Sequence, residues 1–388
     1  MYNFRIKCNI ETLYNGFICT LIFTYMMEAT SAKGFSNSVF HAVLQIISIT
    51  MAASYIIIRK YTLKQLLRIA VLNLIGLLCF LSSGYTGLFM TMLAITLLPE
   101  KSLNRVLRMI LVEEIVVFAG IVLASQIGIL SNSVLEINKG DYIAKGMTLG
   151  FVHPNMLAAQ ATSIVFLFLC VNRNKLKRYH ILMAIFILVL IFFFSQGRTS
   201  MLLGVGTVIL ITLRKKKWVN KFVFMILPWM YVIVLAALVG CMFTYGKWGG
   251  ESTIAKILND SLFNGRIGLA YRSLLVYPIT LFGKPLDVSI WNKWQYYSLD
   301  NGQVMILLEY GIAGFVGYFW VIQKTLNQIK REKETVFAIL MIAFMVWSMY
   351  EGTMYFLGKN FTLLFLGTVG LNKIATTKKD MECEENDS

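Results

Sequence analysis

Apolar runs recur along almost the whole chain, and they constrain its fold more than any other feature. They extend from about residue 14 to about residue 371, separated by short basic stretches rather than by a polar block large enough for a soluble domain. Hydrophobic residues make up 57% of the 388 residues and charged residues only 14%, which lies far outside the range of soluble globular proteins. The sequence therefore predicts one integral membrane domain over residues 1–388.

About twelve of these runs suit a membrane-spanning helix, which needs roughly 20 apolar residues. The predicted spans lie near 10–27, 38–58, 66–82, 85–98, 107–130, 150–171, 180–195, 199–213, 222–243, 303–323, 335–350 and 360–372. We thus expect an all-α, polytopic membrane protein. The first run lacks a small-residue cleavage site, so we expect it to be retained rather than removed as a signal peptide.

The basic residues predict the orientation of the spans. With both termini in the cytoplasm, the inner segments hold 25 of the 36 Lys and Arg residues and the outer segments hold 11, as the positive-inside rule requires. We therefore expect a short cytoplasmic tail at about 373–388 and one large, late extracytoplasmic loop at about 245–300. The net charge of +16 then reflects topology, and it gives no reason to expect nucleic acid as a partner.

A single arginine interrupts the apolar stretch FFFSQGRTSMLLG. Only 15 residues separate Arg198 from Arg214. As a helix they extend about 22 Å, which is less than a hydrocarbon core of about 30 Å. Arg198 is therefore expected to be recessed at the outer face, where it either snorkels from a helix end or binds an anion in a cavity. The neighbouring Gln196 offers a further hydrogen-bonding group.

The large loop and the span that follows it contain other polar candidates. Arg266, Arg272 and Lys284 lie in the loop, and Asp300 and Asn301 immediately precede the next span. An acid at such a helix start is either an N-cap or, if it faces the arginines, a general base.

The segment GFVHPN, residues 150–155, begins an earlier span on the same side of the membrane. Pro154 suits the first turn of a helix. His153 is either a capping residue or a hydrogen-bonding group for a substrate, and Asn155 is a further candidate for substrate binding.

Several kinds of site have no counterpart in the sequence. No GxxxxGK[ST] or DxD motif is present, the six cysteines form no CxxC, and there are only three histidines. We therefore expect no nucleotide hydrolysis, no metal and no cofactor. Glu113 and Glu114 lie within a predicted span, where they either form a proton relay or sit near its cytoplasmic end in water, and we favour the second interpretation.

Outward arginines, aromatic residues and one placed carboxylate suit an anionic, partly lipidic substrate such as a diphosphate, because arginine stays charged and can grip two phosphate oxygens. In four segments the chain resembles the O-antigen ligase and polymerase superfamily, on its Wzy-like polymerase side. These segments are GFVHPN, SQGRTSMLLG, NGRIGLAYRSLLVYPITLFG and LDNGQVMILLEYGIAG. The plan of about a dozen spans with one large late outer loop extends the resemblance over nearly the whole chain.

The resemblance implies a metal-independent glycosyltransferase of the bacterial cytoplasmic membrane. Such an enzyme passes a glycan chain from undecaprenyl diphosphate to a hydroxyl of a second lipid-linked repeat unit, to build O-antigen, capsule or exopolysaccharide. A chain-length regulator and a flippase of the same pathway are the implied protein partners.

The resemblance also implies roles for individual residues. Arg198 and Arg266 are expected to hold the diphosphate, with Arg272 as a further candidate, and Arg272 and Gly283 match a polymerase spacing of an arginine, ten residues and a glycine. No second copy of that spacing starts at Arg198. The ligase branch places a histidine where this chain has Asp300, which favours a polymerase and makes Asp300 the candidate base.

Two other functions share most of these features. A polysaccharide or lipid-linked sugar flippase is also basic, but such transporters usually show two comparable halves and charges near the bilayer midplane. Here the outward charges gather in one late loop. A ligase that attaches finished chains to another acceptor shares most of the site.

Overall fold

The computed structural model describes residues 10–32, 34–99, 102–138, 143–247, 252–287, 289–293 and 299–368. Within these residues the chain is mostly helical, as expected of an all-α membrane protein, with one two-stranded hairpin in addition. The predicted cytoplasmic tail at 373–388 lies outside the described residues.

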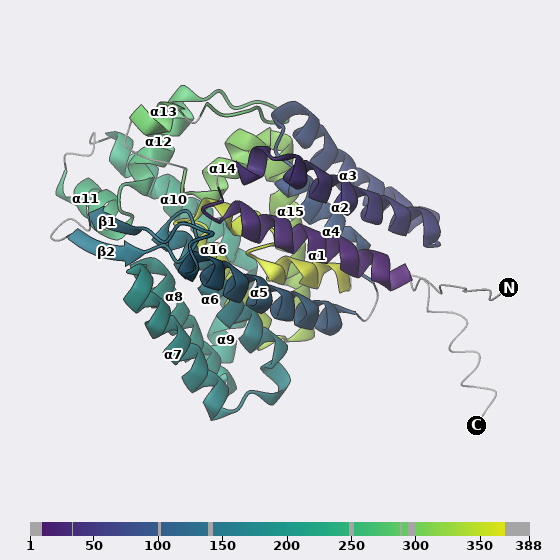
Figure 1. Ribbon diagram of the computed structural model, residues 1–388, viewed down its shortest axis with the longest axis horizontal. Coiled ribbons are helices and arrows are strands. Elements are labelled where there is room, and N and C mark those ends of the chain that lie inside the picture. Colours follow the sequence, from purple (N-terminus) through teal and green to yellow (C-terminus); the bar gives the residue numbers. More distant parts are fainter. Residues whose placement is uncertain are drawn as a thin grey trace.

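The structure describes sixteen α-helices and two strands. They are α1 (Ile10–Glu28), α2 (Val39–Ile58), α3 (Leu63–Ser83), α4 (Gly87–Leu97), α5 (Leu103–Gln126), β1 (Val134–Asn138), β2 (Ile143–Met147), α6 (Pro154–Val171), α7 (Arg178–Ser195), α8 (Arg198–Thr212), α9 (Lys217–Ile226), α10 (Met230–Lys247), α11 (Thr253–Lys256), α12 (Arg266–Val276), α13 (Ser289–Lys293), α14 (Gly302–Glu309), α15 (Gly311–Glu332) and α16 (Thr335–Trp347). Figure 1 shows α11, α12, α13 and the antiparallel β1–β2 hairpin gathered at one side of the helices, with α7 and α8 along the lower edge.

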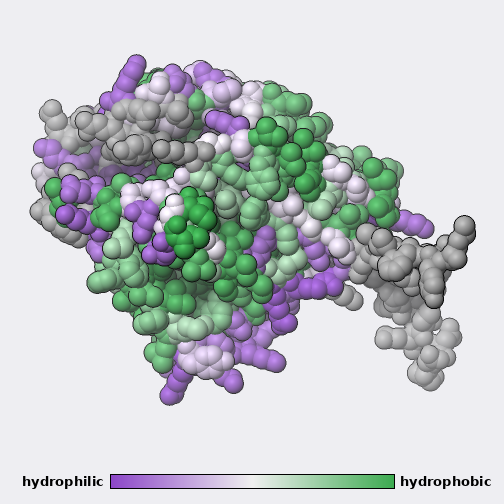
Figure 2. All heavy atoms as spheres, viewed as in Figure 1, coloured by the Kyte–Doolittle hydropathy of each residue, from purple (hydrophilic) through white to green (hydrophobic). Residues whose placement is uncertain are grey.

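Five helical stretches among the described residues are long and apolar enough to cross a membrane. They are Val39–Ile58, Gln65–Ser83, Pro154–Val171, Arg178–Ser195 and Lys217–Lys247. Large apolar side chains are exposed along α7 and α8, and Figure 2 shows this apolar area with hydrophilic residues at the tip below it. Exposed apolar surface of this extent favours contact with lipid over contact with water.

From α1 to α8, the helices lie where the sequence predicts spans, with ends that differ by a few residues, whereas the one span predicted at 222–243 overlaps both α9 and α10, with the 3₁₀ helix Leu227–Trp229 between them. Two later predictions differ in kind. The span predicted at 303–323 is broken into α14 and α15, and residues of the span predicted at 360–372 form a 3₁₀ helix, Phe361–Thr368. The predicted outer segment after α5 also contains the β-hairpin, whose strands the hydropathy pattern did not indicate.

The break between α14 and α15 occurs at Gly311, which has a φ of 69°. The loop after α12 packs into this break, and the amide of Ile312 donates a hydrogen bond to the carbonyl of Thr280 at 3.0 Å. A Cβ atom on Gly311 would lie 2.4 Å from the amide nitrogen of Gly283. The close approach of the loop therefore requires glycine at position 311. The loop also pairs the amide of Ile312, a backbone group that a helix break in a membrane would otherwise leave unsatisfied.

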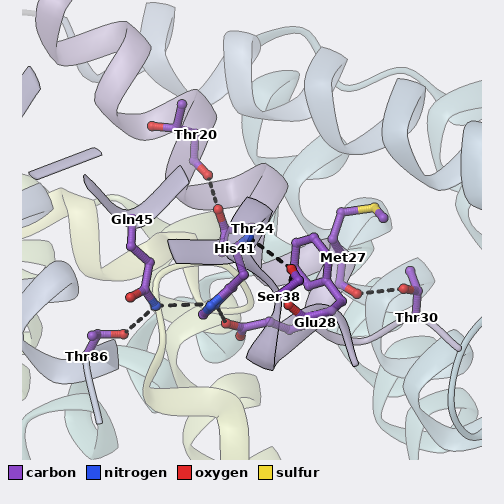
Figure 3. Close-up of polar contacts among 10 residues, drawn as sticks. Thr20, Thr24, Met27, Glu28, Thr30, Ser38, His41, Gln45 and Thr86 are labelled. Atoms are coloured by element: carbon purple, nitrogen blue, oxygen red, sulfur yellow. Dashed lines mark hydrogen bonds and ion pairs between the residues drawn. The ribbon is translucent and has the colours of Figure 1, made fainter. Parts of the chain in front are cut away.

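Polar side chains hold α1 against α2, as Figure 3 shows. His41 Nε2 lies 2.7 Å from the carboxylate of Glu28, and Ser38 Oγ accepts a hydrogen bond from the amide of His41 at 3.1 Å to cap α2. Deeper in the pair, Ser48 Oγ donates to Thr20 Oγ1 at 2.7 Å. Such contacts stabilise helix pairs in lipid, because the hydrophobic effect does not drive helices together there.

Two buried ionisable side chains lie on α5 and on the segment before the last 3₁₀ helix. Glu114 and Lys359 are both buried, and Glu114 Oε2 and Lys359 Nζ have no hydrogen-bond partner among the described residues. Ser163 Oγ of α6 donates a hydrogen bond to the carbonyl of Lys359 at 2.7 Å. The interpretation that both carboxylates lie in water at a helix end is therefore wrong for Glu114, which protein encloses.

Candidate functional site

A cavity of about 390 Å³ lies where the starts of α6, α8 and α12 meet the end of α16. Its lining includes Asn155, Arg198 and Arg266, three residues that the sequence singled out. The other lining residues are Gly197, Thr199, Ser200, Leu202, Leu203, Asp260, Ser261, Leu262, Asn264, Val346, Trp347, Tyr350 and Glu351. The structure thus joins segments more than a hundred residues apart in the chain.

Three helix N-termini meet at this cavity. Asn155 is the second residue of α6, Arg198 is the first of α8 and Arg266 is the first of α12. The first turn of a helix has N–H groups without intrahelical partners, and it carries the positive end of the helix dipole. Three such ends together with two guanidinium groups favour the binding of an anion.

Small residues bring Arg198 to the cavity. A Cβ atom on Gly197, the residue before α8, would lie 2.7 Å from the Cβ atom of Ala158 on α6. The amide of Gly197 donates a hydrogen bond to Ser195 Oγ at 3.2 Å, which fixes the turn between α7 and α8. Since close helix approach in membranes depends on small residues, this contact explains why Arg198 and Asn155 line one cavity.

Asn259 fixes the start of α12. Its Oδ1 atom accepts a hydrogen bond from the amide of Gly268 at 2.7 Å, and its carbonyl accepts one from the amide of Gly265 at 2.7 Å. Asn259 is itself buried. Arg266, the first residue of the helix, is therefore held in place by the preceding turn.

Arg266 is a nearly buried cation. Its side chain is 11% exposed, and Nη2 lies 3.2 Å from Oδ2 of Asp300, whose side chain is 32% exposed. The Nε atom of Arg266 has no hydrogen-bond partner among the described residues. A buried donor of this kind favours a further acceptor, which an anion in the cavity can supply.

Asn301, which follows Asp300, is fully buried. Its Oδ1 atom accepts a hydrogen bond from the amide of Val304 at 3.0 Å and so caps α14, while Nδ2 donates to the carbonyl of Met349 at 3.3 Å. The side chain has no exposed polar atom to meet a substrate. The structure shows Asn301 as the N-cap of α14.

His153 and Gln196 do not line the cavity. His153 Nδ1 accepts a hydrogen bond from the amide of Asn155 at 3.1 Å, which is the capping role that the sequence left open. Gln196 ends α7 with a φ of 55°, and its Nε2 atom donates to the carbonyl of Phe193 at 3.1 Å. Both residues therefore shape the helix ends that carry the cavity residues.

Arg272 and Lys284 also lie away from the cavity lining. Arg272 is partly buried on α12, and its Nε atom donates to the carbonyl of Gly268 at 3.3 Å. Lys284 is partly buried in the loop that fills the break before α15. Of the predicted site residues, the structure thus brings together Asn155, Arg198 and Arg266, with Asp300 joined through its ion pair.

Three titratable lining residues were missed by the sequence reasoning. Tyr350 and Glu351 follow α16, and Asp260 precedes α12. Glu351 lies directly after the span predicted at 335–350. It therefore shows the same signal that marked Asp300, which is a carboxylate at the end of a span.

Within the described part of the chain, no group of three or more His, Cys, Asp or Glu side chains is placed to hold a metal ion. Comparisons of the chain with protein-family models, with curated proteins and with solved structures found no significant match. The function is therefore inferred from the residues of the cavity and from the four sequence segments named above.

Proposed function

We propose that this protein polymerises lipid-linked oligosaccharide repeat units. It transfers a glycan chain from undecaprenyl diphosphate to a hydroxyl of another lipid-linked repeat unit, and the product is an O-antigen, a capsule or an exopolysaccharide. The observation that carries this proposal is the meeting of three helix N-termini with Arg198 and Arg266 at one cavity. That arrangement suits a diphosphate, whose charge needs several donors at once.

The proposal includes a topology of about twelve spans with both termini in the cytoplasm of a bacterial cell. The ends of α6 and α8 remote from the cavity lead into basic stretches, Arg173–Arg178 and Arg214–Lys217. Because basic loops stay in the cytoplasm, the cavity then opens on the outer face of the cytoplasmic membrane. The substrate partners are the lipid-linked units in the bilayer, and a chain-length regulator and a flippase act in the same pathway.

The two arginines stabilise the diphosphate leaving group. As the bond to the anomeric carbon breaks, negative charge builds on the diphosphate oxygen, and guanidinium groups stabilise it. The unpaired Nε of Arg266 gives this residue a donor beyond those that face Asp300. Donors of this kind are typically worth a factor of roughly 10² to 10³ in rate.

A deletion strain complemented with single variants tests the function. Wild-type protein, Arg198→Ala, Arg266→Ala and the control Lys256→Ala are compared at matched membrane levels. Lys256 is exposed on α11 and does not line the cavity. The measurement is the size profile of the surface polysaccharide on gels, together with the amount of lipid-linked intermediate on each face of the membrane.

We expect both arginine variants to lose long chains and to accumulate single repeat units on the outer face, with Lys256→Ala resembling wild type. Repeat units trapped on the inner face identify a flippase instead. Finished chains that remain on their lipid carrier identify a ligase. An unchanged polysaccharide in the deletion strain rejects all three functions.

A further inference from the structure

Glu351 is the buried carboxylate among the residues that line the cavity. It is 9% exposed and lines the same cavity as Arg198 and Arg266. The other lining carboxylate, Asp260, is exposed, and its Oδ1 atom accepts a hydrogen bond from Asn259 at 2.7 Å. Asp300 pairs with Arg266 and does not line the cavity.

The segment that carries Glu351 is clamped to the start of α14. The amide of Gly302 donates a hydrogen bond to the carbonyl of Ser348 at 2.8 Å, and Gln303 Nε2 donates to Ser348 Oγ at 2.5 Å. Asn301 Nδ2 adds its hydrogen bond to the carbonyl of Met349. These hydrogen bonds hold the backbone just before Glu351, and such support helps to position a group for proton transfer.

Close packing holds the other side of this segment. A Cβ atom on Gly352 would lie 2.7 Å from the carbonyl oxygen of Leu299, so only glycine permits this approach. Tyr350 stacks on Phe263, which lies three residues before Arg266. Glu351 is thus fixed between the segment of Asp300 and the start of α12.

We propose that Glu351 is the general base of the transfer reaction and that Asp300 is a positioning residue for Arg266. The inference rests on the proposed function. The hydroxyl of the acceptor sugar gives its proton to the carboxylate of Glu351 while its oxygen forms a bond to the anomeric carbon of the donor glycan. The bond from that carbon to the diphosphate oxygen breaks, and the electron pair leaves with the undecaprenyl diphosphate, which Arg198 and Arg266 hold.

The geometry gives the carboxylates of Asp300 and Glu351 different roles. Asp300 already faces a guanidinium at 3.2 Å, so its ion pair orients the cation that meets the diphosphate. Glu351 lines the cavity in which we place the acceptor hydroxyl. Arg198, Arg266, Asp260 and Tyr350 are the charged or titratable groups that share the lining with Glu351.

Purified full-length protein in lipid nanodiscs tests this assignment. The donor and acceptor are the lipid-linked repeat units that accumulate in the deletion strain, and the rate is the release of undecaprenyl diphosphate followed by mass spectrometry. Binding of added undecaprenyl diphosphate is measured separately by titration. The variants are Glu351→Gln, Glu351→Asp and Asp300→Asn, and Glu136→Gln on β1, which does not line the cavity, is the control.

We expect Glu351→Gln to lower the rate by roughly 10² to 10⁴, the usual share of a general base, and to bind undecaprenyl diphosphate as wild type does. Glu351→Asp is expected to recover part of the rate, because it restores a carboxylate. Asp300→Asn is expected to keep more of the rate than Glu351→Gln does. Binding also reports that Glu351→Gln is folded.

Three results overturn the assignment while leaving the polymerase function intact. They are a wild-type rate in Glu351→Gln, a loss of undecaprenyl diphosphate binding in that variant together with its rate, and a larger rate loss in Asp300→Asn than in Glu351→Gln. If instead the deletion strain accumulates no lipid-linked repeat units, the polymerase function itself is rejected.

Discussion

The rings of Phe263 and Tyr350 stack with their centroids 4.6 Å apart and their planes 14° from parallel. Phe263 is buried just before Arg266, and Tyr350 directly precedes Glu351. One aromatic contact therefore joins the segment that leads into α12 to the segment that follows α16. The stack fixes the relative position of the arginine and the carboxylate across the cavity.

We expect Tyr350→Phe to keep this stack and Tyr350→Leu to lose it. Aromatic pairs contribute about 1 kcal/mol beyond their buried area, so Tyr350→Leu should unfold at a lower temperature than Tyr350→Phe. Thermal unfolding of the two variants in the same detergent measures the difference. Equal unfolding temperatures would show that the stack does not stabilise the site.

Gly311→Ala is expected to be strongly destabilising. A left-handed φ costs a residue with a Cβ atom about 1–2 kcal/mol, and the added atom would also meet the loop backbone at Gly283. Gly206→Ala in α8 is the matched control, because a Cβ atom there meets nothing within 4 Å. The measurement is the yield of folded protein in membranes and its thermal stability. Similar behaviour of the two variants contradicts the packing described for the α14–α15 break.

The effects of Glu114 and Lys359 on the stability of the fold are expected to depend on one another. We expect the two side chains to act as a buried charge pair, in which removing one member leaves the other uncompensated, at a cost of about 3–5 kcal/mol, whereas replacing both members is far less costly. We expect Glu114→Gln and Lys359→Met to unfold at lower SDS concentrations than wild type, and the double variant to recover much of the loss. Additive losses in the double variant would show that the two side chains do not interact.

The orientation of the chain is open to direct labelling. In a variant whose six cysteines are replaced by alanine, a single cysteine is introduced by Lys256→Cys at the cavity end or by Lys175→Cys at the opposite end of α6. A membrane-impermeant maleimide added to intact cells is expected to label the first variant only. Permeabilised cells should label both. Labelling of Lys175→Cys alone in intact cells reverses the proposed topology.

Hydropathy predicted the places of most helices because a membrane span is a local property. About 20 consecutive apolar residues suffice to define one, whatever the rest of the chain does. The same reasoning missed the break at Gly311, because the break is stabilised by a loop about thirty residues earlier in the chain, through Thr280 and Gly283. It also missed Glu351, since one carboxylate at a span end looks the same in sequence whether it faces solvent or a cavity.

The sequence by itself determined a helical, membrane-embedded chain and marked Asn155, Arg198 and Arg266 as polar exceptions at the ends of apolar runs. Only the tertiary structure decided that these three residues line one cavity, that Asp300 pairs with Arg266, and that Glu351 lies among them. The physical reason is the distance along the chain over which each effect acts. Apolar length and charge bias act along neighbouring residues, whereas a site of this kind depends on which distant helix ends approach closely, and contacts such as that between Gly197 and Ala158 determine that approach.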